Sequence, residues 1–419
     1  MTSDKAPAEA YVWLWLPDQA EPVVAGRLEA TAQGLQFNYG RSYLARNEAI
    51  ALYDQELPLR AGQIALKPGL MMPGCVRDAS PDAWGRRVII NRLLGIGGRN
   101  TDPDILGELT YLLESGSDRI GALDFQRSPS VYQPRTSNEA TLDELLESAE
   151  RVEQGVPLSP ELAQAIQHGS SIGGARPKAL IADNNRKLIA KFSSSADVYN
   201  VVKAEFIAMR LAALAGLKVA PVSLARAAGK DVLLIERFDR IRDRQGWKRR
   251  LMVSALTLLE LDELHARYAS YETLAEIVRM RFRQPKAGLR ELFARLVFNI
   301  LCGNTDDHAR NHAAFWDGHE LELTPAYDLC PQSRTGNEAT QAMLIHGDNR
   351  FSSLRVCVDA AAQFQLSETE ARAIINQQLE CIRSNWQTVC DEASLTQIDR
   401  ELMWGRMFLN PFALQGYDA

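Results

Sequence analysis

Residues 11–70 alternate apolar and polar positions in the way that β-strands do. The apolar positions lie at residues 11–16, at residues 23–28 and at Leu35, Phe37 and Tyr39, with turn-forming residues between them. This pattern predicts a small β-rich unit. Ser80 and Pro81 then have the character of an N-cap and a first helical residue, so we expect a helix from there to Gly95.

A Ser-, Pro- and Gln-rich stretch at residues 127–138 indicates either a linker or a covered loop. Thr141 and Glu144 follow it in capping-box spacing and predict the start of another helix. Between residues 171 and 239 the pattern predicts a hairpin, a helix and a second hairpin. Their expected positions are strands at 179–181 and 188–192 around a turn at 183–185, a helix at 203–215 with Gly216 as its left-handed cap, and strands at 222–226 and 232–236 around Gly229.

Beyond Trp247 the chain is expected to be mainly helical. The clearest amphipathic helix places its apolar residues on one face at Leu289, Leu292, Phe293, Leu296, Val297, Ile300 and Leu301. We expect this helix to end at Gly303. A further helix is expected over residues 368–386.

The composition is that of a globular protein large enough to form a cleft. The chain has 419 residues, 46% of them apolar and 24% charged, and ordinary domains of about 100–200 residues suggest several packed units. The formal net charge is −6, so the basic excess typical of DNA-binding domains is missing. The six cysteines have no CxxC spacing, and neither an export signal nor a membrane-spanning apolar run is recognisable. We expect reduced thiols and a cytoplasmic protein with no membrane contact.

Three polar residues after the amphipathic helix have the spacing of a phosphoryl-transfer site. Four residues separate Asp306 from Asn311, and Asp328 follows seventeen positions later. Phosphoryl transfer needs an aligned hydroxyl and divalent ions on the phosphates, but little covalent chemistry from the protein. A carboxylate at Asp306 could accept the hydroxyl proton, and Asn311 and Asp328 offer the oxygen ligands that Mg²⁺ prefers. The alternative is an ordinary polar loop in which Asp306 only caps a backbone group.

Upstream of this loop, three further features suit an ATP site. Residues 170–178, SSIGGARPK, could bring backbone N–H groups over phosphates, because glycine permits a close approach. Lys191 on the next strand pair could hold the α- and β-phosphates, and Glu205 could pair with it. Simpler interpretations are an ordinary turn, a lysine that protects an edge strand and a first-turn glutamate favoured by the helix dipole. The loop is not a Walker A motif, and residues 95–98 end a helix and so do not form a dinucleotide-binding fingerprint.

Taken together, these motifs resemble the HipA serine/threonine kinases, the toxin halves of bacterial HipBA toxin–antitoxin systems. The segments that carry the resemblance are SSIGGARPK, LIAKF, LLIERFDR, GNTDDHARN and LTPAYDL, with VWLWL and SPDAWGRRVI nearer the N-terminus. The resemblance covers nearly the whole chain. It implies an α+β, two-lobed, protein-kinase-like fold with a β-rich N-terminal lobe and an all-helical C-terminal lobe. The implied parts are a HipA N-terminal-like subdomain at residues 1–126, an ATP-binding part at 127–239 and a C-terminal lobe at 240–419.

The resemblance also implies ATP and Mg²⁺ as cofactors. Asp306 is the expected catalytic residue, and Asn311 and Asp328 are the expected metal ligands. The expected ATP-binding residues are Ile172, Gly173, Gly174, Ala175, Lys178, Lys191, Glu236, Phe238 and His308, with adenine held around residues 236–238. The family phosphorylates itself on a serine that corresponds to Ser171, with Ser170 as the alternative. A phosphate adds about −1.5 to −2 charges to a loop that must close over ATP, so we expect it to hold the loop open and silence the kinase.

Known relatives phosphorylate aminoacyl-tRNA synthetases, which stalls translation and produces dormancy, so the resemblance implies a substrate of this kind. The implied partner is a small HipB-like helix-turn-helix antitoxin, and contact with operator DNA would be indirect, through that antitoxin. Two alternatives stay open: a catalytically weak relative that mainly serves as an antitoxin-binding co-repressor, and a small-molecule or lipid kinase of the same fold. Every expected catalytic position carries the right residue type, which favours the active protein kinase.

Three features depart from this pattern or allow another interpretation. Arg176 stands where many family members have glutamine, which adds a positive charge to the loop. His308 and His312 have a spacing that can bind metal on a helix, but no third ligand lies within sequence reach, so His308 is expected to brace the catalytic loop. The basic residues 237–250 indicate a solvated hairpin, or a patch that meets DNA phosphates inside an antitoxin complex.

Overall fold

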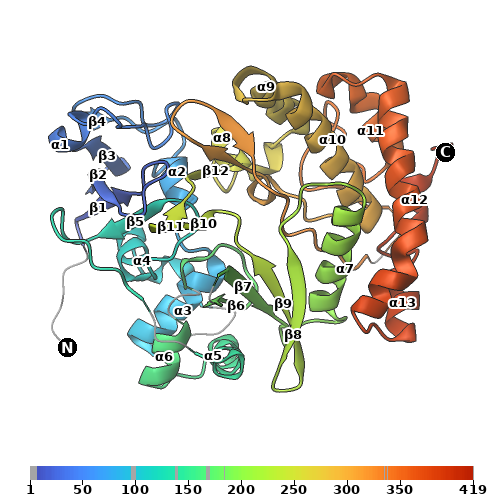
Figure 1. Cartoon of the computed structure of the whole chain (residues 1–419), viewed down its shortest axis with the longest axis horizontal. Coiled ribbons are helices and arrows are strands. Elements are labelled where there is room, and N and C mark those ends of the chain that lie inside the picture. The colour runs from blue at the N-terminus through green and yellow to red at the C-terminus, as the bar shows by residue number, and fades with distance from the viewer. Residues whose placement is uncertain are drawn as a thin grey trace. The chain divides into compact units, whose positions relative to one another are not determined.

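Figure 1 shows the computed structural model of the chain. The chain forms two compact units. The structure describes residues 7–95, 101–136, 140–166, 170–183, 185–334, 336 and 338–418. Unit 1 consists of Met1–Ala196, Ala225–Val253 and Trp316–His319, and unit 2 of Asp197–Leu224, Ser254–Phe315 and Glu320–Ala419. The expected domain boundaries at residues 126 and 239 stay predictions.

The β-rich start of the chain forms an antiparallel sheet in unit 1. Its strand order is β4-β3-β2-β1-β5, with β1 at Glu9–Leu14, β2 at Val23–Thr31, β3 at Gly34–Tyr39, β4 at Gln63–Ile64 and β5 at Leu123–Gln126. Side chains that alternate along a strand point to opposite faces of the sheet. The face that carries Val12, Leu28 and Phe37 is packed inside the protein, and these three side chains are fully buried. The short helices nearby are α1 (Arg41–Leu44), α2 (Gly74–Arg77), η1 (Pro103–Ile105) and α4 (Glu108–Glu114).

Over its described residues 127–136, the Ser-, Pro- and Gln-rich stretch is a mostly exposed loop that is anchored at Tyr132. The ring of Tyr132 lies 5.4 Å from that of Trp13 and 5.5 Å from that of Trp15. Its hydroxyl donates to Oδ2 of Asp124 at 3.1 Å. One aromatic anchor therefore holds a segment whose composition equally suited a linker. Residues 137 and 138 of that stretch lie outside the described residues.

Helix α3 (Ala83–Leu94) starts later than Ser80 and Pro81 predict, so that prediction was wrong at this end. Asp82 is the N-cap, and its side chain makes no capping hydrogen bond. Its carboxylate instead accepts the N–H of Gly174, 92 residues away in the chain, at 2.5 Å. The predicted end is confirmed, because Gly95 has the left-handed φ of +64°. Residues 96–98 of the glycine-rich segment 95–98 lie outside the described residues.

The two predicted hairpins form one four-stranded sheet in the order β6-β7-β9-β8. The strands are β6 (Lys178–Ala182), β7 (Lys187–Phe192), β8 (Val222–Ala227) and β9 (Lys230–Glu236). Helices α3, α5 (Leu142–Gln154) and α6 (Pro160–Ile166) share a buried core with these strands, built from residues such as Trp84, Val88, Leu146, Val152, Ala190 and Phe192. The capping box of Thr141 and Glu144 is confirmed. Asn184 of the predicted turn lies outside the described residues.

Helices dominate unit 2, where α10 contacts α9, α11 and α12 (Figure 1). The bounds are α7 Val201–Leu214, α8 Ala255–Leu258, η3 Ala266–Tyr268, α9 Tyr271–Arg281, α10 Pro285–Cys302, η4 Ala309–Asn311, α11 Leu354–Ala360, η5 Ala361–Phe364, α12 Glu368–Glu392, α13 Gln397–Met403 and α14 Pro411–Leu414. The predicted amphipathic helix is α10, and it ends at Gly303 as expected. Gly216 follows α7 with φ +86°, also as expected.

The part of the chain after residue 239 is not all-helical. Strands β10 (Arg240–Asp243) and β11 (Gly246–Arg249) form a hairpin, and β12 (Met252–Ser254), β13 (Ala313–Trp316) and β14 (Leu321–Leu323) form a three-stranded sheet. The run AAFW of β13 is too short for a helix, and Gly318 after it takes a φ of +101°, which suits a tight turn. This local signal overrides the helical character of the surrounding sequence.

All six cysteines are free thiols, and five of them are buried, in agreement with their irregular spacing. Burial raises the pKa of the Cys302 thiol to about 12, which suppresses its reactive thiolate form. Within the described ranges, no helix is both long and apolar enough to pass through a lipid bilayer.

Candidate active site

The predicted catalytic loop begins at the left-handed cap of α10. Gly303 has a φ of +74°, and a Cβ at this position would lie 2.5 Å from the carbonyl oxygen of Met407, so only glycine fits. The N–H of Gly303 donates to the Ile300 carbonyl at 3.2 Å, and that of Asn304 donates to the Asn299 carbonyl at 2.8 Å. The first residues of the loop are therefore fixed to the buried end of the helix.

The two adjacent aspartates of this loop have opposite environments. Asp306 is exposed, whereas Asp307 is only 1% exposed. The Tyr271 hydroxyl donates to Oδ2 of Asp307, and Nε2 of His312 lies 2.8 Å from Oδ1. Burial and the Asp307 charge raise the pKa of Tyr271, which keeps its hydroxyl protonated as the donor. Both Asp307 oxygens therefore have internal partners, and Asp306 is the carboxylate that a substrate can reach.

The pKa of the Asp306 carboxyl is raised above its ordinary value. Desolvation is the largest cause, and the charges of Asp328 and Asp307 raise it further, whereas His308 acts in the opposite direction. His308 is the half-buried residue that precedes η4. A raised pKa makes a carboxylate a better proton acceptor, provided that it remains ionised at the working pH. The surroundings of Asp306 thus favour its use as a general base.

Asn311 is oriented by the backbone of the same loop. Its Nδ2 donates to the carbonyl oxygen of Asp306 at 3.1 Å, and its backbone N–H donates to the carbonyl oxygen of His308 at 2.8 Å. The side-chain oxygen Oδ1 is the atom that remains for a cation. The loop therefore holds Asn311 directly against the backbone of Asp306.

Asp328 adopts a backbone conformation that is uncommon outside glycine. Its φ is +59°, and such conformations cost of order 1–3 kcal/mol and concentrate at functional sites. Nδ2 of Asn304 lies 3.4 Å from its carbonyl oxygen, which links Asp328 to the start of the catalytic loop. The charge of Asp328 also raises the pKa of Asp306. Unit 2 thus brings Asp306, Asn311 and Asp328 together.

These oxygen donors fit a Mg²⁺ ion that arrives with a nucleotide. Mg²⁺ typically takes one or two carboxylates from the protein and keeps waters or phosphate oxygens as its other ligands. Within the described part of the chain, no cluster of three or more His, Cys, Asp or Glu residues could hold a metal by itself. His308 and His312 flank the short helix η4 rather than share the face of a longer one, and Nε2 of His312 is engaged by Asp307.

The Gly-rich loop lies in unit 1 and leads directly into β6. Ser170, Ser171 and Ile172 at its start are 1%, 2% and 3% exposed. The ammonium group of Lys178 donates to the carbonyl oxygen of Gly173, so the loop folds back over the lysine that follows it. The carbonyl oxygen of Ala175 accepts from the Arg87 side chain.

Two buried lysines accompany this loop. Lys178 and Lys191 are direct partners in the antiparallel pair β6–β7 and are 5% and 8% exposed. Residues opposite each other in such a pair project to the same face of the sheet. Two positive side chains therefore converge beside the Gly-rich loop, and this is the charge that a triphosphate requires. The expected pair between Lys191 and Glu205 of α7 stays a prediction.

The predicted adenine contacts, Glu236 and Phe238, flank a buried arginine. Both are half-buried, whereas the side chain of Arg237 is fully buried. Nη1 of Arg237 lies 3.0 Å from Oδ1 of Asp118, and its Nε and Nη2 lie 3.0 and 2.8 Å from the Asp239 oxygens. The Arg237 side chain therefore anchors the backbone of residues 236–238.

The basic stretch at residues 237–250 forms the expected hairpin, but its first arginines are not solvated. The Arg240 side chain is 2% exposed and lies 2.8 Å from both Asp118 and Asp239. These carboxylates hold Arg237 and Arg240 in a buried ion-pair network. Buried, paired guanidinium groups cannot reach DNA phosphates, so the DNA-contact alternative is wrong for these two arginines. Asp118 comes from the loop before β5, so no local pattern around the hairpin could show that it lies there.

Sequence reasoning missed the residues that support the site. Tyr271, Asp307 and His312 form one buried polar cluster beneath the catalytic loop. The sequence signal for this cluster was the adjacent pair Asp306-Asp307, because two neighbouring carboxylates rarely serve the same role. Asp118, between Ser117 and Arg119, carried no recognisable signal.

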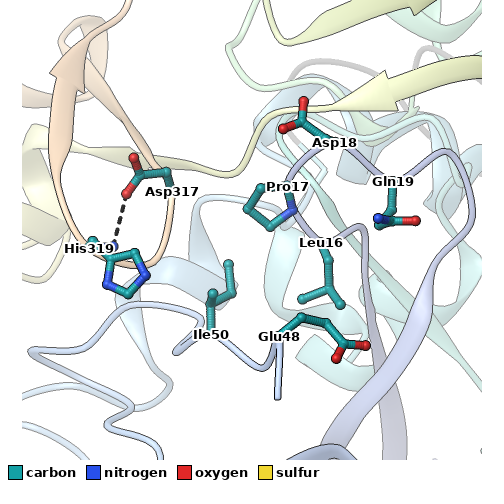
Figure 2. Close-up of a pocket in the computed structure, with 8 residues that line it drawn as sticks. All are labelled: Leu16, Pro17, Asp18, Gln19, Glu48, Ile50, Asp317 and His319. Carbon is teal, nitrogen blue, oxygen red and sulfur yellow. Dashed lines mark hydrogen bonds between the residues drawn. The ribbon is translucent and has the colours of Figure 1, made fainter. Parts of the chain in front are cut away.

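A separate pocket in unit 1 holds none of the predicted site residues. Figure 2 shows its lining, which consists of Leu16, Pro17, Asp18, Gln19, Glu48, Ile50, Asp317 and His319. The Asp317 carboxylate accepts the N–H of His319 at 2.9 Å. Three carboxylates on its lining would repel the phosphates of a nucleotide, so this pocket does not suit ATP.

Comparisons with known proteins agree with these features. Residues 17–126 match the HipA N-terminal domain, and residues 170–386 match the HipA-like C-terminal domain. The protein named "Putative kinase Y4mE" of Sinorhizobium fredii is 26% identical over 322 residues, which cover 71% of this chain and 74% of that protein. The serine/threonine-protein kinase toxin HipA of Shewanella oneidensis is 28% identical over 186 residues, 38% of this chain and 42% of that protein.

Among solved structures, a chain of the complex of HipA, HipB and operator DNA from Shewanella oneidensis MR-1 aligns with a TM-score of 0.68. The alignment covers 96% of this chain and 99% of that chain at 20% identity, which establishes a shared fold. The predicted α+β, kinase-like fold class is thereby confirmed. Because the C-terminal match alone spans residues 170–386, more than half of the 419 residues, this chain belongs to the HipA family.

Proposed function

We propose that the protein is an ATP-dependent serine/threonine protein kinase. The observation that carries the proposal is the grouping of Asp306, Asn311 and Asp328, with Asp306 left open beside the internally bonded Asp307. A substrate hydroxyl at Asp306 would give its proton to that carboxylate. The hydroxyl oxygen would form a bond to the γ-phosphorus as the bond from that phosphorus to the ADP oxygen breaks. The raised pKa of Asp306 favours this proton transfer.

The other residues of the proposed site bind and orient ATP. Oδ1 of Asn311 and the carboxylate of Asp328 would hold Mg²⁺, which neutralises phosphate charge when bound. His308 is proposed to brace the loop at Asp306. In unit 1 the proposed ATP-binding groups are the backbone N–H groups of Ile172, Gly173 and Ala175 around the turn at Gly174, the ammonium groups of Lys178 and Lys191, and the adenine contacts at Glu236 and Phe238.

Incubation of the full chain with γ-labelled ATP, Mg²⁺ and a bacterial cell extract tests this proposal. We expect label on serine or threonine of one or a few proteins, identified by phosphoproteomics. Removal of divalent ions with EDTA should abolish labelling, and excess Mg²⁺ should restore it. The proposed ligands Asn311 and Asp328 carry no positive charge, so the neutralisation of the phosphates at this position depends on the ion. Labelling that is equal with and without the protein, or unaffected by EDTA, would contradict the kinase proposal.

The proposal includes self-phosphorylation on Ser171, with Ser170 as the alternative. Both serines are buried, and Oγ of Ser170 accepts the N–H of Gly116 at 3.2 Å. A phosphate carries three oxygens and about −1.5 to −2 charges, which such a buried position cannot accept. Phosphorylation would therefore require the loop to leave this position and would prevent its return. We propose that this is how phosphorylated Ser171 silences the kinase.

Protein purified from cells is expected to carry phosphate on Ser171, and the Asp306→Asn variant is expected to carry none there. Mass spectrometry of the loop peptide measures both. Ser170→Ala is the matched control and should retain the phosphate, whereas Ser171→Ala should lose it. Phosphoserine that persists in Asp306→Asn would point to another kinase.

The partner and the substrate are proposed at the level of class. The structural neighbour comes from a complex of HipA, HipB and operator DNA, which supports a HipB-like helix-turn-helix antitoxin as the partner. Contact with DNA would then be indirect. We propose a translation component such as an aminoacyl-tRNA synthetase as the substrate, and the cytoplasm as the place of action, on the resemblance alone.

A further inference from the structure

The segment SPDAWGRR at the start of α3 contacts the Gly-rich loop through Arg87, but it has no role so far in ATP binding or catalysis. We propose that the first turn of α3 positions the Gly-rich loop, with Asp82, Trp84 and Gly85 as the positioning residues. They are called the loop support below. The loop support lies in the part that matches the HipA N-terminal domain, whereas the loop lies in the part that matches the C-terminal domain. The kinetic consequences rest on the proposed function, but the structural consequence does not.

Three hydrogen bonds join the loop support to the loop. Oδ2 of Asp82 accepts the N–H of Gly174 at 2.5 Å, and the N–H of Trp84 donates to the carbonyl oxygen of the same glycine at 3.1 Å. The indole N–H of Trp84 donates to the carbonyl oxygen of Lys178 at 2.9 Å. Gly174 is the residue of the loop with a left-handed φ, +101°, and both of its backbone polar groups are held. Its orientation sets the direction in which the neighbouring N–H groups point.

Gly85 allows the start of the loop to lie against the helix. A Cβ on Gly85 would lie 2.2 Å from the carbonyl oxygen of Ser170 and 3.0 Å from its carbonyl carbon. Both neighbours are backbone atoms, so no side-chain rotation can relieve the overlap. The buried position of Ser170 and Ser171 therefore depends on the absence of a side chain at residue 85.

The loop support is itself rigid. Trp84 is fully buried and shares a core cluster with Val88 of the same helix and with Ala179 and Ala190 of β6 and β7. The helix and the strand that follows the loop thus belong to one packed core. A change at Asp82 or Gly85 is expected to act on the loop first, because the atoms that these residues contact are the backbone atoms of Gly174 and Ser170.

Hydrogen exchange without nucleotide tests the structural part. In Gly85→Ala we expect the amides of residues 170–178 to exchange about tenfold faster, since the loop can no longer pack on the helix. Gly107→Ala is the matched control, because Gly107 precedes α4 with a φ of −73° and has open space around its Cβ position. Unchanged loop exchange in folded Gly85→Ala would overturn the inference, whether or not the protein proves to be a kinase.

Asp82→Ala provides a second variant that introduces no overlap. It removes the acceptor for the Gly174 N–H, so we expect the KM for ATP to rise about tenfold, with kcat close to that of the wild type. Asp306 in unit 2 is untouched by either substitution. A fall in kcat at constant KM, or wild-type values of both together with unchanged exchange, would overturn the assignment of Asp82 as a positioning residue.

Discussion

Asp306→Asn is expected to lower the rate of phosphoryl transfer from ATP by roughly 10²–10⁴-fold, the contribution usual for a positioned general base. The amide has nearly the same shape as the carboxylate but cannot accept the hydroxyl proton. Asp306 is exposed, so the fold does not depend on its charge. Steady-state kinetics should show the loss in kcat with little change in the KM for ATP, and thermal unfolding should match the wild type.

The neighbouring aspartate supplies a matched control of the same residue type. Asp307→Asn alters a carboxylate that the hydroxyl of Tyr271 and Nε2 of His312 contact inside the protein. Its main effect is expected to be a loss of stability of roughly 1–3 kcal/mol, as for other buried groups that lose a partner. Equal rate losses in the two variants, with unchanged stability in both, would contradict the assignment of Asp306 as the base.

The raised pKa of Asp306 adds a pH dependence to this first prediction. A protonated carboxyl cannot accept the substrate proton, so kcat should fall as the pH drops through that pKa. The acid limb is therefore expected above the ordinary aspartate value of about 3.9. It should be absent from the residual activity of Asp306→Asn. A profile with an identical acid limb in both proteins would assign it to another group.

Asp239→Asn is expected to destabilise the protein by about 3–5 kcal/mol, the usual cost of removing one partner from a buried ion pair. The Asp239 carboxylate accepts hydrogen bonds from Arg237, Arg240 and the N–H of Gly121, the last at 2.7 Å. Without its charge, Asp118 alone would balance two buried guanidinium groups. Urea unfolding of the full chain, followed by tryptophan fluorescence, measures the loss.

Asp243→Asn is the control for this second prediction, because Asp243 lies at the exposed end of the same hairpin and pairs with Lys248 at 2.7 Å. We expect no measurable shift of the unfolding midpoint there. If Asp239→Asn shifts the midpoint no more than Asp243→Asn does, the buried network does not stabilise the fold.

The network also predicts how stability depends on pH. Burial by itself would raise the pKa of Asp239, but Arg237 and Arg240 lower it, and the net direction is downward. A carboxyl whose pKa is lower in the folded than in the unfolded state stabilises the fold above its unfolded pKa. That contribution is lost as the pH falls from the ordinary aspartate range through the lowered pKa. The wild type should therefore lose stability on acidification more steeply than Asp239→Asn.

Local signals account for the elements that were predicted correctly and for the spacing of the candidate site residues. Helix α10 and its end at Gly303 follow from apolar spacing and one glycine, and the capping box of Thr141 and Glu144 lies within four residues. Asp306 and Asn311 share one short loop, so their spacing alone was enough to suggest a common site. Asp328, seventeen positions after Asn311, completed the spacing, and the resemblance to HipA kinases then implied its role as a metal ligand.

Only the tertiary structure decided which charged residues are buried and where α3 begins. Composition suggested that the hairpin with Arg237 and Arg240 is solvated. Both arginines are buried, and Asp118, more than a hundred residues earlier in the chain, pairs with them. Asp82 bonds to the loop at Gly174 instead of capping the helix as a local rule would have it. Backbone propensities act over a few residues. A buried charge or N–H group must be paired, and its partner can come from any part of the chain that the fold places next to it. By itself, therefore, the sequence determined the N-terminal strands, the two central hairpins, the long helices and the spacing of the candidate site. The long-range contacts determined the strands β12 to β14, the start of α3 and the supports of the site.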